Sequence, residues 1–226
     1  MRNIKIDFDE VYRYLGCRGK ASDKALEELT RAAALVLETA RPKHVARLCA
    51  VERGGTLRLS GTSFLLTGRA ISELLRESGE CFIFCATLGN GVDALIRRWE
   101  LKDMAFAMTL DACASSAVES LCNNIESELR EDARARGLYL TDRFSPGYED
   151  LPLELQKPFC ADLDTARKIG VTVTDSGLLL PRKSVTALIG ISDRPQKHRD
   201  AGCESCTALK ACKFRKDGVT CYGHIL

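Results

Sequence analysis

The segment Arg143-Phe144-Ser145-Pro146-Gly147-Tyr148 places a guanidinium, a hydroxyl and a phenol around a Pro-Gly step. Proline presets φ and glycine tolerates positive φ, so this step predicts a tight turn. A guanidinium can bind a carboxylate through two parallel hydrogen bonds. The segment therefore predicts a turn that holds Arg143 and Tyr148 toward one small polar ligand. The alternative is an ordinary surface turn with a solvated arginine.

A second group of chemically active residues lies near the C-terminus, where four cysteines form the pattern Cys203-x2-Cys206-x5-Cys212-x8-Cys221. Four thiolates can complete a tetrahedral zinc site or hold an iron–sulfur cluster, and a Cys-x-x-Cys pair directs two sulfurs at one metal. His198 and His224 could replace one of the thiolates. We expect a metal here; the spacing leaves open iron–sulfur, zinc, a redox-active Cys203–Cys206 pair and reduced tail cysteines.

The composition indicates a soluble globular protein. The chain has 226 residues, 45% of them hydrophobic, and a net charge of +2. This charge favours neither nucleic acid nor an anionic membrane as a partner, and no apolar run is long enough to span a bilayer. We expect a cytoplasmic protein, because the N-terminus lacks the apolar core of a signal peptide. The remaining seven cysteines are predicted to be small buried hydrophobic residues: Cys17, Cys49, Cys81, Cys85, Cys113, Cys122 and Cys160.

Helices and strands alternate without a regular βαβ repeat. Helices are predicted from a cap at Ser22, at 71–79, from 90 to 99, over 103–136 and over 162–168, where Gly170 ends the last of them. Strands are predicted at 4–8, 45–51, 56–59, 81–87, 171–174 and 185–191, with Gly54-Gly55 as a hairpin turn. The pattern predicts an α+β domain with a central twisted antiparallel or mixed sheet flanked by helices, over residues 1–193. Residues 194–226 are predicted to form a linker and the Cys-rich C-terminal tail.

Several motifs occur in an order that resembles a known family. They are Thr87-Leu88-Gly89, Leu110-Asp111-Ala112, Ala117-Val118-Glu119, Arg143-x-Ser145-Pro146-Gly147-Tyr148, Ile169-Gly170-Val171 and Lys183-Ser184-Val185. Together they resemble the activation domain of vitamin B12-dependent methionine synthase, and more closely its short, free-standing relatives, over roughly residues 40–192. The family motif is usually Arg-Pro-Ala-Pro/Ser-Gly-Tyr, and here Phe144 and Ser145 replace two of its positions.

The resemblance implies a domain that binds S-adenosylmethionine in a shallow groove beside an antiparallel sheet. Carried onto this sequence, it implies that Arg143 holds the ligand carboxylate, that the backbone of Gly147 lies against the ligand, and that Tyr148 and Ser145 belong to the same site. It also makes Glu119, on the long helix, a candidate partner for the ligand's ammonium or ribose groups. The alternative for Glu119 is a place on the solvated face of a helix.

The function that the resemblance implies is reactivation of a cobalamin-dependent methyltransferase, within methionine biosynthesis. One electron reduces cob(II)alamin, and S-adenosylmethionine then supplies the methyl group. Cobalamin would be carried by a partner protein, because the chain lacks an Asp-x-His-x-x-Gly motif, and an electron donor would be a second partner. An iron–sulfur cluster in the tail could deliver the electron. The alternative function is a non-catalytic metal- or ligand-binding sensor or assembly factor with the same fold.

Overall fold

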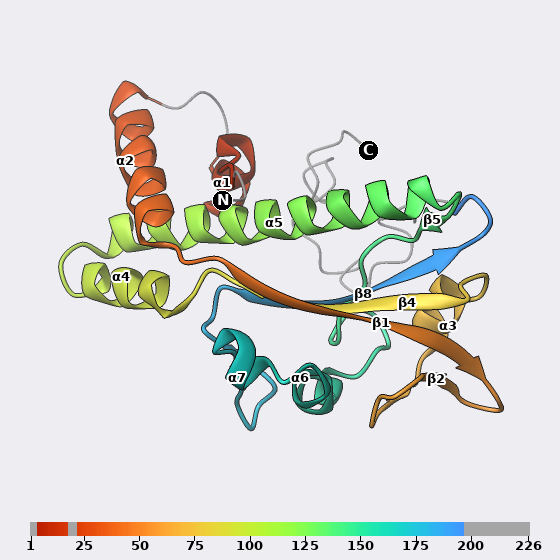
Figure 1. Cartoon of the computed structure of the whole chain (residues 1–226). Helices are drawn as coiled ribbons and strands as arrows, with labels where there is room; N and C mark the ends of the chain where they lie inside the picture. The colour runs from red at the N-terminus through yellow and green to blue at the C-terminus, as the bar shows by residue number, and fades with distance from the viewer. Residues whose placement is uncertain (1–3, 18–21, 197–226) are drawn as a thin grey trace.

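A six-stranded antiparallel sheet forms the centre of the computed structural model, which describes residues 4–17 and 22–196 (Figure 1). Its middle consists of three long strands, β1 (Lys43–Arg53), β4 (Glu80–Thr87) and β8 (Ser184–Ser192). Three short strands complete the order β3-β2-β1-β4-β8-β5: β2 (Leu57–Leu59), β3 (Leu65–Leu66) and β5 (Tyr139–Leu140). The predicted α+β fold class is confirmed, with an antiparallel main sheet rather than a mixed one.

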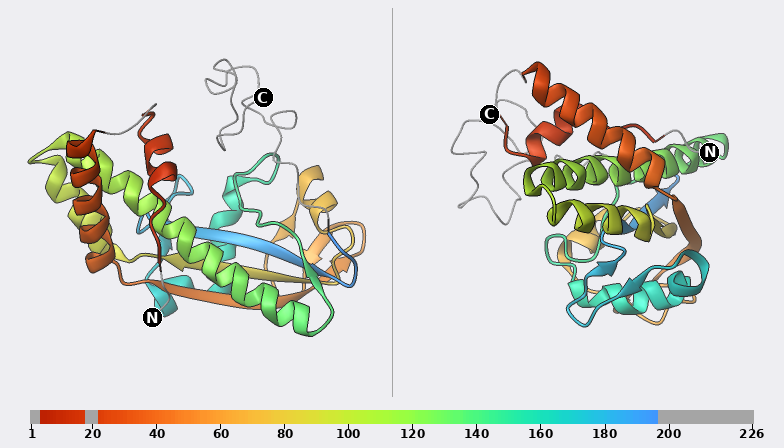
Figure 2. Two further views of the ribbon diagram at one scale, coloured as in Figure 1. Left: turned by 90° about the horizontal axis from the view of Figure 1, so that it is seen from above. Right: turned by 90° about the vertical axis from the view of Figure 1, so that its left-hand side faces the viewer.

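Helices cover both faces of this sheet, as Figure 1 and the right-hand view of Figure 2 show. The upper face in Figure 1 carries α1 (Phe8–Tyr14), α2 (Asp23–Thr39), α4 (Asn90–Glu100) and α5 (Met104–Ala135). The lower face carries α3 (Arg69–Leu74), the 3-10 helix η1 (Leu153–Leu155), α6 (Gln156–Leu163), α7 (Thr165–Ile169) and the hairpin of β6 (Thr172–Val173) with β7 (Leu179–Leu180). The sheet thus separates two hydrophobic cores.

Strand β4 supplies side chains to both cores. Phe84 belongs to the upper core with α2, α4 and α5, whereas Ile83 and Cys85 belong to the lower core with α3, α6 and α7. Successive side chains of a strand point to opposite faces, so a strand covered on both sides must be apolar at nearly every position. This explains the continuous apolar run that predicted a buried strand at 81–87.

The long helix α5 lies across the sheet in the view from above (Figure 2). Asp103 caps it, because its Oδ1 accepts the backbone N–H of Phe106 at 3.1 Å. The face toward the sheet is buried and rich in small residues, among them Cys113, Ala114 and Ala117. The helix predicted over 103–136 is therefore confirmed, as is the cap at Ser22, whose Oγ accepts from the N–H of Ala25.

The strand predicted at 4–8 is wrong. Residues 4–7 run along α5, and α1 begins at Phe8. The backbone N–H of Lys5 donates to Ser120 Oγ at 2.9 Å, and that of Asp7 donates to Ser116 Oγ at 3.0 Å. The serine hydroxyls of α5 therefore accept the backbone hydrogen bonds that a neighbouring strand would otherwise accept. The alternating pattern reflects this extended, half-buried segment, and the sequence did not identify its partner.

Three further predictions need correction. The helix α3 ends at Leu74, before Gly79, and the helix predicted over 162–168 is two helices that meet at Asp164. Asp164 adopts a left-handed conformation with φ of 55°, which interrupts the helix. Cys17 is exposed, whereas the other six described cysteines are buried as predicted. Among the helices of the described residues, none combines the length and the apolarity that crossing a membrane requires.

Candidate ligand-binding site

The segment that follows β5 is fixed to the outer edge of β8. The N–H of Thr141 donates to the carbonyl of Gly190 at 3.0 Å, and its Oγ1 accepts the N–H of Gly190 at 2.8 Å. Phe144 and Leu188 then exchange two backbone hydrogen bonds, of 2.9 and 2.7 Å. Residues 141–144 are therefore held at both ends, and Arg143 lies between the two anchors.

The backbone of this segment directs Arg143 toward α5. The side chain of Phe144 is buried in the lower core, and side chains alternate along an extended segment. The Nη2 of Arg143 lies 3.1 Å from Glu119 Oε2 and donates to Asn123 Oδ1 at 2.8 Å. Its Nε lies 3.4 Å from Glu126 Oε2. Glu119, Asn123 and Glu126 are spaced by four and three residues, which places them on one face of the helix.

The contacts that the described residues make with Arg143 leave one of its nitrogens without a hydrogen bond. The side chain is 22% exposed, so its charge is partly removed from water and depends on the surrounding carboxylates. Glu126 is shared, since its Oε1 lies 2.6 Å from Nη2 of Arg130. Within the part of the chain that the structure describes, Nη1 of Arg143 is buried and makes no hydrogen bond. A buried donor without a partner is unfavourable, and a ligand carboxylate could relieve that cost.

The Pro-Gly step forms the predicted turn. The N–H of Tyr148 donates to the carbonyl of Ser145 at 3.1 Å, and Gly147 has a φ of 90°, the positive value that the third position of a type II turn requires. Tyr148 is 59% exposed, and its ring centroid lies 6.2 Å from that of Phe144. The turn therefore holds Tyr148 beside Phe144, while Arg143 faces α5.

The last residue of helix α1, Tyr14, lies close enough to Glu119 to be affected by its charge. The hydroxyl of Tyr14 donates to Glu10 Oε1 at 2.8 Å. Burial, this hydrogen bond and the negative charges of Glu10 and Glu119 raise the pKa of Tyr14 well above its ordinary value. Tyr14 therefore stays a neutral phenol at physiological pH, with its polar end among carboxylates.

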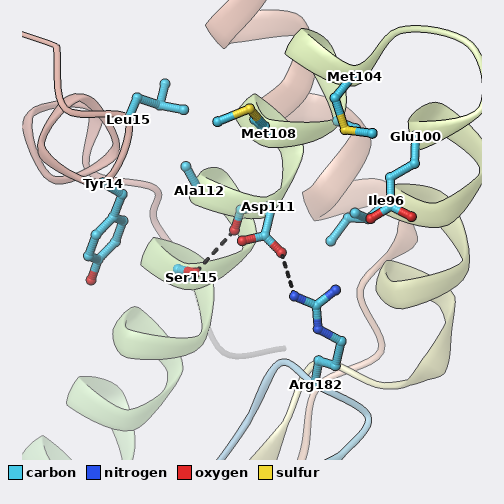
Figure 3. Close-up of a pocket in the computed structure, with 11 residues that line it drawn as sticks. Tyr14, Leu15, Ile96, Glu100, Met104, Met108, Asp111, Ala112, Ser115 and Arg182 are labelled. Atoms are coloured by element: carbon cyan, nitrogen blue, oxygen red, sulfur yellow. Dashed lines mark hydrogen bonds and ion pairs between the residues drawn. The ribbon is translucent and has the colours of Figure 1, made fainter.

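A cavity of about 360 Å³ continues from Tyr14 along α5 (Figure 3). Its wall is mixed: Met104, Met108 and Ile96 are apolar, and its polar groups include Asp111 and Ser115. Figure 3 shows the side chain of Arg182 pointing toward Asp111. The Nη2 of Arg182 lies 3.8 Å from Asp111 Oδ1. Asp111, Ser115 and Glu119 follow one another at spacings of four, so the cavity and the Arg143 cluster lie along the same row of α5.

The structure thus brings together Arg143 and Glu119, two predicted site residues that lie on different elements and 24 positions apart in the sequence. It places Ser145, Gly147 and Tyr148 in the adjoining turn. Sequence reasoning missed Asn123 and Glu126. Their spacing from Glu119 on a predicted helix was visible, but polar residues at that spacing are also typical of a solvated helix face.

The predicted metal ligands Cys203, Cys206, Cys212 and Cys221 lie outside the described residues, so the metal site stays a prediction. So does the division into a domain of residues 1–193 and a tail of residues 194–226. Within residues 4–17 and 22–196, no three His, Cys, Asp or Glu side chains come together as metal ligands would.

Fold and site define an α+β domain with an arginine–carboxylate cluster at the edge of its sheet. No model of a known protein family matches the sequence, and no curated protein matches it either. Among solved structures, the fold is similar to the crystal structure of the MetH reactivation domain bound to AdoHcy (S-adenosylhomocysteine). The match has a TM-score of 0.63 and 17% sequence identity, and covers 96% of this chain and 82% of that chain. The resemblance that the sequence indicated is thereby confirmed at the level of the fold.

Proposed function

We propose that this chain binds S-adenosylmethionine and serves as the reactivation component of a cobalamin-dependent methyltransferase, of which methionine synthase is the leading candidate. The observation that carries the proposal is the placement of Arg143. It lies at the sheet edge, and its buried Nη1 has no hydrogen-bond partner among the described residues, in a fold similar to that of a domain solved with AdoHcy. AdoHcy is S-adenosylmethionine without its transferable methyl group, so it presents the same amino acid and nucleoside groups.

In the proposed reaction, one electron reduces cob(II)alamin on the partner to cob(I)alamin. The cobalt then attacks the methyl carbon of the sulfonium, the carbon–sulfur bond breaks, and S-adenosylhomocysteine leaves with the electron pair of that bond. This chain contributes position rather than acid–base chemistry. Arg143 holds the carboxylate of the ligand, and Glu119 lies beside it as the acceptor for the ammonium group.

The partners in this proposal are a cobalamin-carrying protein and an electron donor, and neither nucleic acid nor a membrane takes part. An iron–sulfur cluster on the four tail cysteines would place an electron source on the same chain. If the tail held zinc instead, the electron would have to come from an external reductant, because zinc is not redox-active.

Two measurements test the proposal. Calorimetry of the full chain should show binding of S-adenosylmethionine, and Arg143→Ala should weaken it by on the order of 1.5–3 kcal/mol, the cost of a charge-assisted hydrogen bond. Mixing the chain with a cob(II)alamin-loaded methionine synthase, a reductant and S-adenosylmethionine should convert the cobalamin spectrum to that of methylcobalamin. Binding without that conversion would instead favour a ligand-binding sensor, and absence of binding would overturn the proposal.

A further inference from the structure

Strand β1 has a neighbouring strand along most of one side but only at the C-terminal end of the other. It pairs with β4 over residues 43–50 and with β2 over residues 51–53. Next to the pairing with β2, the N–H of Ser60 donates to the carbonyl of Ala50 at 2.8 Å. In the left-hand view of Figure 2, the orange-brown β1 forms the border of the sheet. Within the described part of the chain, the N-terminal half of β1 is therefore an edge strand.

Hydrogen bonds near the end of β1 show which backbone groups point outward. The N–H of Val51 donates to the carbonyl of Gly79, which precedes β4, whereas the carbonyl of Ala50 faces the β2 side. Because successive residues of an antiparallel strand bond to opposite sides, Ala46 and Leu48 direct both backbone groups away from β4. No described residue forms a hydrogen bond with these outward groups. The stretch from Ala46 to Leu48 is the β1 edge.

Arg47, at the centre of the β1 edge, lacks an opposite charge among the described residues. Its Nε and Nη2 are buried, and none of those residues forms a hydrogen bond with them. The side chain points to the lower face, because its partner in the register is Ile83 of the lower core. Ala46 and Leu48 point to the upper face and are exposed, Leu48 by 40%. A partly buried guanidinium and unpaired backbone groups are both unfavourable, so the edge is incomplete in charge and in hydrogen bonding.

The charge of Arg47 argues against two occupants of the β1 edge. In each antiparallel register that joins the outward groups of Ala46 and Leu48 to those of a second copy, the two Arg47 side chains lie opposite or diagonally adjacent on one face. Like charges placed opposite one another are destabilising. The second occupant would be the segment 197–226 of this chain, which contains six Lys and Arg but only three Asp and Glu. Its net charge has the same sign as that of Arg47.

We propose that the β1 edge accepts an antiparallel strand from a partner protein, and that this strand carries an Asp or Glu between two apolar residues. The outward groups of Ala46 and Leu48 supply the backbone hydrogen bonds, which give affinity. Arg47 then lies in a non-hydrogen-bonded cross-strand pair, the kind in which side chains come closest, and binds the carboxylate. The apolar residues on either side of the acid cover Ala46 and Leu48, because side chains alternate between the two faces.

The β1 edge is separate from the candidate ligand site. The strand order β3-β2-β1-β4-β8-β5 places β4 and β8 between this edge and the Arg143 segment. The inference therefore does not rest on binding of S-adenosylmethionine, and a strand at the β1 edge leaves Arg143 accessible.

Nuclear magnetic resonance of the full chain with two synthetic peptides tests the inference. The acidic probe is Ac-Ser-Thr-Val-Glu-Val-Thr-Ser-NH2, and the matched peptide has Gln in place of Glu. The acidic peptide should slow hydrogen exchange at the amides of Ala46 and Leu48 and leave that of Val45, which faces β4, unchanged. It should bind roughly tenfold more tightly than the matched peptide, the effect of a hydrogen bond to a charged group.

Three variants assign the effect to the β1 edge. Arg47→Gln should weaken the acidic peptide roughly tenfold and the matched peptide by less than about twofold. Ala46→Pro removes an outward N–H, which an edge strand tolerates, and should weaken both peptides alike. Urea denaturation checks that this variant folds, and Arg47→Gln decides the question if it does not. Arg98→Gln is the matched control, because it removes an exposed arginine of α4 and should change neither affinity.

Four outcomes would overturn the inference. If neither peptide protects Ala46 and Leu48, Arg47 only guards the edge against pairing. Equal affinity of the two peptides for the wild type would mean that the carboxylate is not read, and equal weakening by Arg98→Gln would indicate general charge attraction. Protection of both amides before any peptide is added would show that the edge is already covered. A dependence of that protection on protein concentration would identify a second copy, and its absence would identify the chain itself.

Discussion

The ammonium of Lys183 lies 2.9 Å from Oδ1 of Asp111, and the side chain of Lys183 is only 10% exposed. The same ammonium donates to Ser115 Oγ at 2.9 Å. These contacts join the start of β8 to α5 at the cavity end of the site. Removing an ammonium group from water is unfavourable, and contacts of this kind offset that cost.

We therefore expect Asp111→Asn to destabilise the protein. The substitution preserves the shape of the side chain and removes the charge that faces Lys183. The loss should be about 2 kcal/mol, below the roughly 3–5 kcal/mol of a fully buried pair, because Asp111 is 37% exposed. Urea denaturation gives the free energy of unfolding directly. The exposed pair Lys157–Asp175 supplies the control, since Asp175→Asn should leave the midpoint unchanged. An unchanged midpoint for Asp111→Asn would mean that Lys183 does not need the carboxylate.

A methyl group added at Gly190 should disrupt the anchor of the Arg143 segment. A Cβ there would meet Ser78 Oγ, would lie 2.8 Å from Leu75 Cδ2 and would lie 3.0 Å from Thr141 Cγ2. Gly190→Ala should cost about 1–3 kcal/mol, as overpacking of a tight core does. Thermal unfolding measures the loss. Gly54→Ala, where a Cβ meets nothing within 4 Å, should unfold like the wild type. Equal melting temperatures for Gly190→Ala and Gly54→Ala would contradict the close packing around Gly190 of β8.

The attachment of the Arg143–Tyr148 turn to α3 should depend on pH. Asp150 follows the turn and accepts the N–H of Arg69 at 2.6 Å and that of Ala70 at 3.1 Å. These backbone hydrogen bonds, that of Arg69 foremost, lower the pKa of the Asp150 carboxyl. A lowered folded-state pKa adds stability above the ordinary pKa of the carboxyl, and this stability is lost as the pH falls through the folded value.

The variant Asp150→Asn tests this dependence, because an asparagine can still cap the helix but cannot titrate. The wild type should be the more stable of the two at neutral pH, and the difference should shrink as the pH falls below about 4. Hydrogen exchange at the backbone amides of Arg69 and Ala70 provides the local readout. At low pH these amides should exchange faster in the wild type than in Asp150→Asn. A stability difference that is constant with pH would refute the role of the ionised carboxylate.

Thiol labelling should divide the cysteines into classes. Cys17 is exposed and should react with iodoacetamide at once, whereas the six buried thiols should react only on unfolding. Burial raises the pKa of Cys113 and of Cys122 to about 12, which suppresses their thiolates further. Mass spectrometry after brief labelling identifies the modified residues. Early labelling of Cys113 would contradict the closed upper core.

The same experiment examines the tail. If Cys203, Cys206, Cys212 and Cys221 hold a metal, they should resist labelling until a chelator removes it, and their release should be cooperative. Anaerobic purification followed by iron, sulfide and zinc analysis identifies the metal. Stoichiometric zinc without iron would exclude electron delivery by the tail, and immediate labelling of all four would exclude the metal site.

The sequence predicted most elements whose signals are local. The cap at Ser22, the apolar run of β4 and the 3.6-residue periodicity of α5 each depend on neighbours in the chain, and all three are confirmed. The strand predicted at 4–8 failed because an extended backbone satisfied by helix hydroxyls gives the same alternation as a strand. The prediction of one continuous helix over 162–168 failed for a different reason. The left-handed conformation of Asp164 breaks that helix, and it leaves no signal in the periodicity of the sequence.

The candidate site was predictable only in part. The turn chemistry of Pro146-Gly147 is local and was identified, and the resemblance related Arg143 to Glu119. The roles of Asn123 and Glu126 depend on the anchoring of residues 141–144 to β8, which brings two distant segments together. Contacts of that kind follow from tertiary packing, and helix periodicity alone cannot distinguish them from solvent-facing positions.

The dependence of the Arg143 cluster on a single helix limits how this protein can change in evolution. Glu119, Asn123 and Glu126 share a face because of their spacing, and inserting or deleting one residue between them would rotate part of the set by about 100°. Substitutions elsewhere on α5 would leave that spacing intact. Divergent descendants of this chain should therefore be traceable by Glu-x3-Asn-x2-Glu on a long helix and an arginine 17 positions further on, even where little else in the sequence can be aligned.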